Sequence, residues 1–200
     1  MSDPAPAPAP NPENIEALTF VKSMLTTGTA KYSSDLGAGW GGEAFGKGLS
    51  AMTIEGNWIS GALSKDFPKV KYRTVELPAG PKGKGTLQFT NCWGIAADSK
   101  NKPAAKKLVE QLTSTQSQIG FAKAFGVMPS VESAAAEFKS AFPEQAASLA
   151  GAEYAQTLPS QPGASDVIKD LNAKLATLKT SDPKAILDAV QTEMTAVLAK

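Results

Sequence analysis

Three tryptophans, Trp40, Trp58 and Trp93, are the residues whose type and placement best fit a chemical task. All lie within residues 40–93, beside glycine, asparagine and cysteine. An indole ring can stack on the apolar C–H face of a pyranose, while nearby amides and carboxylates take the sugar hydroxyls. This placement predicts a carbohydrate-binding surface. The alternative is that each ring is buried in a core.

Side chains suited to catalysis are scarce. The chain has no histidine, which excludes histidine-based triads and histidine-ligated metal sites. Its single cysteine, Cys92, excludes an intrachain disulfide or a cysteine cluster for zinc, and we expect this side chain to be buried. The acidic residues Asp35, Glu43 and Glu55 form no recognisable pair of general acid and base. The sequence therefore predicts no enzyme, no cofactor and no metal site.

Two glycine motifs resemble phosphate-binding loops but lack the neighbouring elements that such loops require. Residues 37–42 read G-x-G-x-x-G, but no strand precedes them. Residues 41–47 read G-x-x-x-x-G-K, but Gly48 follows where a magnesium ligand is required. A serine–lysine dyad stays open, with Ser99 and Lys102 as a spacing match, although a helix cap explains Ser99. We interpret both glycine motifs as turns.

Composition and charge narrow the class of protein. The 200 residues are 42% hydrophobic and 20% charged, as in ordinary globular proteins. Twenty basic against nineteen acidic residues give a net charge of +1, without the basic excess of a nucleic-acid binder. No apolar run approaches the roughly 18 residues of a membrane span. The first residues, MSDP, lack the basic and apolar regions of a signal peptide, so we expect none in this chain.

The pattern of residues predicts a mixed α/β or α+β chain that becomes purely helical after residue 97. An extended Pro/Ala-rich leader is expected at 1–12, and Asn11 and Gly28 should cap the two ends of the first helix. Ser165 and Ser181 should cap the last two helices. Strands are expected at 49–54, 70–77 and 86–97, the last buried on both faces; helices are expected near 43–47, 58–63, 103–113, 115–125, 130–138 and 143–154.

One ordered series of motifs is similar to a known family. The stretch WGGEAFGKGLSAMTIEGNW (residues 40–58) resembles the solute-binding proteins of bacterial ABC sugar importers, the family that includes maltose-binding protein. The similarity continues through VKYRTVELPAGPKGKG, through LQFTNCWGIAADSKNKPAAKKLVEQL and into the closing helices, so that it covers residues 13–200. It implies a periplasmic-binding-protein-like II fold, with two α/β lobes and the sugar in a cleft between them.

The resemblance also implies which residues contact the sugar. Trp58 takes the role of aromatic platform, and Trp40, Asn91 and Trp93 face the cleft or the hinge. The loop Ser160–Ser165 approaches the ligand, with Gln161 as its hydrogen-bonding residue. The implied ligand-binding residues are Trp58, Trp40, Trp93, Asn91, Gln161, Gly56 and Glu55.

Length is the main departure from the family, whose members run to roughly twice this chain. We expect the N-terminal half of the family's fold to be missing. Residues 13–96 and 143–200 then belong to the C-terminal lobe, and 97–142 pack toward the absent one. An unpaired sheet edge and an uncovered helix face would favour self-association.

The leading hypothesis is a fragment of an ABC importer's carbohydrate-binding subunit, with an oligosaccharide as ligand and the transporter's membrane subunits as partners. Its parent would be periplasmic or extracellular and anchored to the membrane. The isolated fragment should bind sugar weakly, because half the cleft is missing. The alternative is an interaction or scaffold module, a split half that folds or oligomerises with a partner. A carbohydrate-active enzyme is a third, weaker hypothesis.

Overall fold

A computed structural model describes residues 9–199, so most of the leader expected at 1–12 lies outside the described residues. Nine α-helices, three 3₁₀ turns and two short strands make up this part of the chain. The elements are α1 (Pro12–Thr27), η1 (Ser34–Leu36), α2 (Gly41–Gly46), α3 (Ile59–Asp66), β1 (Thr86–Leu87), α4 (Lys102–Leu112), α5 (Thr115–Phe125), η2 (Glu132–Ala134), α6 (Ala135–Ala141), η3 (Pro143–Gln145), α7 (Ala146–Gly151), β2 (Ala155–Gln156), α8 (Ala164–Leu175) and α9 (Pro183–Leu198).

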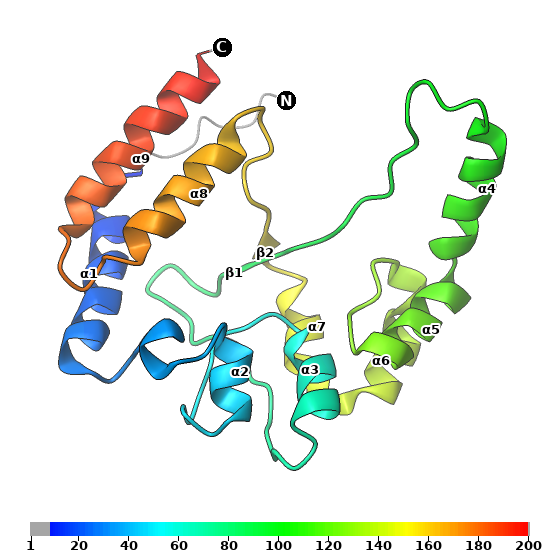
Figure 1. The fold of residues 1–200 in the computed structure, drawn as a ribbon, viewed down its shortest axis with the longest axis horizontal. Coiled ribbons are helices and arrows are strands. Elements are labelled where there is room, and N and C mark those ends of the chain that lie inside the picture. The colour runs from blue at the N-terminus through cyan, green and yellow to red at the C-terminus, as the bar shows by residue number, and fades with distance from the viewer. Residues whose placement is uncertain (1–8, 200) are drawn as a thin grey trace. The chain divides into compact units, whose positions relative to one another are not determined.

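The chain divides into two units, and unit 1 combines the residues up to Leu36 with Pro159–Lys200. In unit 1, α8 and α9 lie side by side and α1 packs against α9 (Figure 1). Leu25, Leu178 and Ile186 form its buried core. This arrangement follows from amphipathic helices that cover one another's apolar faces.

The caps of α1 fall where the sequence predicts them. The Asn11 side chain accepts a hydrogen bond from the backbone N–H of Asn14 at 2.7 Å, and Gly28 ends the helix with φ of 78°. The caps of the last two helices differ from the prediction. Gly163 precedes α8 in place of Ser165, and the Asp182 carboxylate caps α9 in place of Ser181.

Unit 2 comprises Gly37–Leu158 and has its own core. Phe138 of α6 is fully buried against Ile119 and Ala122 of α5. Gly126 ends α5 with φ of 70°, as predicted. Helices α2 and α3 pack on each other, and β1 pairs with β2 in parallel. The described residues are thus mostly helical with few strands.

The expected strands are the main correction. Residues 49–54 and 70–77 form no strand, and of 86–97 only Thr86–Leu87 does so, pairing with Ala155–Gln156. The segment predicted to be buried on both faces is exposed, and so is Cys92. The reason is physical: a strand satisfies its backbone only through a neighbour, so an alternating sequence alone does not make a sheet. The lobe boundaries expected at residues 96 and 142 stay a prediction.

Candidate functional site

Two of the three indoles occupy equivalent positions at the beginning of short helices. Trp40 is the residue before α2 and Trp58 is the residue before α3. Neither side chain makes a capping hydrogen bond. The two rings therefore do not bond to the backbone at the start of either helix, and other contacts hold them in place.

Trp58 is held in one orientation by its own loop. Its indole N–H donates to the Glu55 carboxylate at 3.2 Å. The ring lies directly on Gly56, where an added Cβ would come within 2.2 Å of ring carbons. Phe89 meets the indole edge-on at 5.9 Å between centroids and 74° between planes. The side chain nevertheless stays 43% exposed, so a fixed aromatic surface is presented to solvent.

The Glu55 carboxylate also joins Trp58 to the beginning of α2. A Cβ added at Gly41 would lie 2.7 Å from both Glu55 Oε1 and Thr53 Oγ1. The neighbouring Trp40 ring lies over Gly42, where an added Cβ would be 2.1 Å away. Glycine is required at both positions because any side chain would displace these groups. The Glu55 carboxylate thus lies against the turn that carries Trp40 and bonds to Trp58, and we call the two turns with this carboxylate the indole–carboxylate site.

The loop that carries Trp58 is anchored by residues that are distant in sequence but belong to the same unit. The Asn57 side chain donates to the Gly126 carbonyl at 3.1 Å and to Gln145 Oε1 at 3.4 Å. Gln145 is buried and donates to the same carbonyl at 3.3 Å. The backbones of Gly61 and Gly126 touch, since a Cβ on Gly61 would lie 2.2 Å from the Phe125 carbonyl oxygen. These contacts fix where α3 begins.

Glu43 controls the charge next to Trp40. Its carboxylate accepts hydrogen bonds from the Lys47 ammonium and from the backbone N–H of Gly39, the latter at 2.6 Å. The bond from Lys47 and then the bond from Gly39 lower the pKa of Glu43. Glu43 is therefore ionised at neutral pH and holds the glycine turn before α2 in place.

The structure unites only part of the predicted site. Trp58 contacts both Glu55 and Gly56, and Glu55 also lies close to Gly41, the residue that follows Trp40. Asn91 and Trp93 are exposed on the segment after β1, where Trp93 is 61% exposed. Gln161 is exposed in unit 1, in the loop before α8. All seven stay candidates for ligand binding.

Sequence reasoning missed two supports of the site, Phe89 and Gln145. Phe89 could have been found from the odd-numbered apolar positions that it shares with Trp93. Gln145 lies 88 residues from Asn57, its partner, and no local signal connects them.

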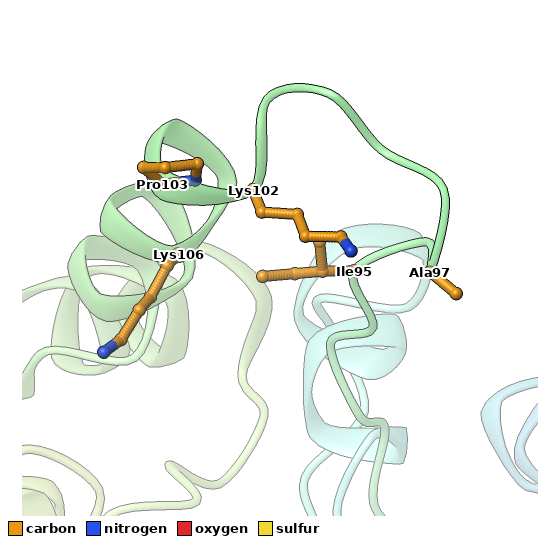
Figure 2. A pocket seen from close by; sticks show the side chains of 5 residues that line it. All are labelled: Ile95, Ala97, Lys102, Pro103 and Lys106. Atoms are coloured by element: carbon orange, nitrogen blue, oxygen red, sulfur yellow. The ribbon is translucent and has the colours of Figure 1, made fainter.

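Two shallow hollows lie in unit 2, each of about 550 Å³, and none of the seven predicted residues lines them. Ile95 and the first turn of α4 line the first (Figure 2). In Figure 2 the Lys102 side chain extends toward Ile95, whereas the Lys106 ammonium points away. The lining surface is mostly apolar, and its charged side chains are two lysines, so it lacks the mixture of donors and acceptors that orients a ligand.

The second hollow adjoins a polar cluster of three side chains. Lys84 donates to Glu76 Oε2 at 2.7 Å, and the Tyr154 hydroxyl donates to the same oxygen at 2.7 Å. The Lys84 ammonium lies 5.6 Å from the centre of the Tyr154 ring. The bonds from Lys84 and Tyr154 lower the pKa of Glu76. This cluster ties the segment before β1 to the end of α7.

The described residues, 9–199, hold neither a metal-ligating cluster nor a membrane-spanning helix. No group of three or more histidine, cysteine, aspartate or glutamate side chains is placed to hold a metal ion in this range. Nor is any helix in the described part of the chain long and apolar enough to cross a membrane.

Comparison with known proteins gives consistent matches. The family model of the bacterial extracellular solute-binding proteins matches residues 5–151. A protein of Brucella abortus (strain 2308), described as a binding protein, is 26% identical over 94% of this chain and 47% of its own length. The diacetylchitobiose binding protein DasA of Streptomyces coelicolor is 27% identical over 70% of this chain and 34% of its own length. The chain thus spans about half the length of the Brucella relative.

Proposed function

This chain belongs to the bacterial extracellular solute-binding proteins, and we propose that it supplies an aromatic carbohydrate-binding surface to such a protein. Proteins of this family bind their solutes without transforming them, so the chain is a binding protein and not an enzyme. The observation that carries the proposal is the indole of Trp58, seated on Gly56, tethered by Glu55 and still partly exposed.

The chemistry of the indole–carboxylate site favours a sugar over a charged or wholly apolar solute. An indole face fits the C–H face of a pyranose, and a ring of this kind adds about 0.5–1.5 kcal/mol beyond burial. The Glu55 carboxylate can accept sugar hydroxyls, because each carboxylate oxygen accepts more than one hydrogen bond. The diacetylchitobiose-binding relative supports an oligosaccharide as the ligand.

For the whole protein we propose the two-lobed α/β architecture of the periplasmic-binding-protein-like II class. The proposed partners are an oligosaccharide and the membrane subunits of an ABC importer, and the proposed location is the cell exterior or periplasm, with an anchor to the membrane. Asn91, Trp93 and Gln161 are proposed to complete the ligand contacts. Because this chain spans about half of its relatives, we expect it to bind sugar only in the millimolar range.

The test is a titration of the chain with diacetylchitobiose and with maltotriose, followed by NMR of the indole N–H signals. We expect the Trp58 signal to shift and Trp58→Ala to weaken binding about 5- to 10-fold, since about 1 kcal/mol of ring contact is lost. Phe121→Ala is the matched control, because Phe121 is an exposed ring in an aromatic pair elsewhere in unit 2. Unchanged sugar affinity in Trp58→Ala would contradict the proposal that the Trp58 ring stacks on the sugar. Micromolar binding by this chain would contradict the expected millimolar affinity.

One observation favours a second candidate function, that of an interaction module. The segment after β1 exposes apolar side chains and has almost no strand partner among the described residues. Pairing with another polypeptide would satisfy both its backbone and its apolar face.

A further inference from the structure

Residues 86–97 form an uncharged segment, TLQFTNCWGIAA, that continues from β1 toward α4 (Figure 1). Its odd positions carry Leu87, Phe89, Trp93 and Ile95, and its even positions carry small or polar side chains. We propose that residues 87–95 pair with the same segment of a second copy of this chain, antiparallel and centred on Asn91. This inference does not rest on the carbohydrate site.

The existing pairing of β1 decides which edge of the segment is free. The backbone N–H of Gln88 donates to the carbonyl of Gln156 at 2.9 Å, and within residues 9–199 the strand pairing ends there. Peptide groups alternate between the two edges of an extended chain. Since the even-numbered Gln88 faces β2, the N–H and C=O groups of the odd-numbered residues face the opposite edge. Within residues 9–199, no strand pairs with that edge, and the Asn91 carbonyl accepts only a long bond of 3.5 Å from the Thr90 hydroxyl.

Side-chain parity then selects the register. Pairing through the free edge matches odd residues with odd residues, which places both apolar faces on the same side. Centring on Asn91 sets Leu87 opposite Ile95 and Phe89 opposite Trp93, and the two Asn91 side chains face each other. Aromatic and β-branched pairs of this kind stabilise antiparallel strands. Centring on Cys92 would instead pair Trp93 with Asn91 and leave fewer apolar pairs.

Charge and exposed area favour a second copy as the occupant. The segment lacks the charged residues that keep exposed strand edges apart, so two copies meet without repulsion. Phe89 is 58% exposed and Trp93 61% exposed, which leaves roughly 250 Å² of aromatic surface in each copy. With Leu87, Ile95 and the backbone, the pair buries roughly 1,000 Å², the lower limit for a specific but weak interface.

The first test measures mass against concentration by sedimentation equilibrium. We expect the mass to rise from 20.7 kDa toward twice that value as the chain approaches several hundred micromolar. Phe89→Lys should raise the dimer Kd at least about tenfold, because it removes the Phe89–Trp93 pair and places an ammonium inside the interface. Phe121→Lys should leave it within about twofold, since Phe121 is 57% exposed and also sits in an aromatic pair. A mass that stays at 20.7 kDa, or equal effects of the two variants, overturns the proposal.

The second test reads the register by oxidative cross-linking and does not depend on a lysine variant that could disturb folding. Directly opposed residues in an antiparallel pair have Cα atoms about 5.5 Å apart, within disulfide range. We expect Asn91→Cys in a Cys92→Ser background to form a disulfide-linked dimer on a non-reducing gel. Wild-type Cys92, which faces Thr90 in this register, should cross-link several-fold more slowly. Faster cross-linking of wild-type Cys92 overturns the register.

Discussion

The two units of this chain differ in how completely they bury their apolar side chains. In unit 1, α1, α8 and α9 cover one another around Leu25, Leu178 and Ile186. In unit 2, the segment after β1 leaves Phe89 and Trp93 exposed. A helix satisfies its backbone within itself and needs only an apolar neighbour, whereas a strand needs a second strand to bond with. The contrast indicates that a strand segment without a partner leaves its apolar side chains exposed, although helices also carry exposed rings such as Phe20 and Phe121.

The largest expected effect tests whether unit 2 has a core of its own. Phe138→Ala removes a fully buried ring that stacks on Phe142 and should lower the free energy of unfolding by about 3–5 kcal/mol. Hydrogen exchange followed by mass spectrometry should show the loss of protection in α5 and α6. Phe121→Ala, an exposed ring on α5, should change stability by less than about 0.5 kcal/mol. Equal loss of protection in α1 and α9 would contradict a core that belongs to unit 2 alone.

The matching change in unit 1 is Leu178→Ala. Leu178 is buried between α8 and α9 and contributes to the core with Leu25 and Ile186, so we expect a loss of about 2–5 kcal/mol. Protection from exchange should fall in α1, α8 and α9. Leu198→Ala, at the exposed end of α9, is the control and should have little effect. Loss confined to unit 2 amides would contradict separate cores.

A smaller effect compares helix caps in the two units. Asn11→Ala removes the side-chain bond that caps α1 and should lower stability by about 1 kcal/mol. Asn101 holds the equivalent position before α4 but makes no capping hydrogen bond, so Asn101→Ala should be close to neutral. Thermal unfolding monitored by circular dichroism measures both variants. An equal loss of stability in the two variants would show that the Asn11 capping bond does not stabilise the protein.

The smallest expected effect concerns pH and the polar cluster of unit 2. Hydrogen bonds from Lys84 and Tyr154 lower the pKa of Glu76 below its ordinary value of 4.5. A carboxyl group with a lowered pKa stabilises the fold at every pH above its ordinary pKa. This stabilisation is lost as the pH falls through the lowered pKa. The stability difference between wild type and Glu76→Gln should therefore shrink as pH falls from 7 to below 4.5. A stability difference that does not change with pH would contradict a stabilising role for the ionised Glu76 carboxylate.

Local signals predicted a large part of this structure. The cap of α1 at Asn11, its end at Gly28, the end of α5 at Gly126 and the full span of α5 all follow from residue types within one or two turns. The family resemblance is confirmed by the match over residues 5–151. Such features need no knowledge of the rest of the chain, because capping and helix termination depend on neighbouring residues.

Features that depend on distant residues were beyond sequence reasoning. Apolar and polar side chains alternate along residues 86–97 as they do in a strand. The pairing of this segment depends on Ala155–Gln156, and no residue near it in the sequence indicates that partner. The contact of Glu55 with Trp58 is local in sequence, and that both residues belong to one ligand site stays a prediction. The anchoring of their loop by Gln145 joins positions far apart in sequence and requires the folded chain.

The bond between Asn57 and Gln145 has a consequence for synthesis of the protein. The two residues are 88 positions apart, and a ribosome adds about 5–20 residues each second, so roughly 4–18 s separate their appearance. During that interval the loop that carries Trp58 lacks the amide that later secures it. The nascent chain therefore carries Trp58 on a loop that has its local partners, Glu55 and Gly56, well before Gln145 is added.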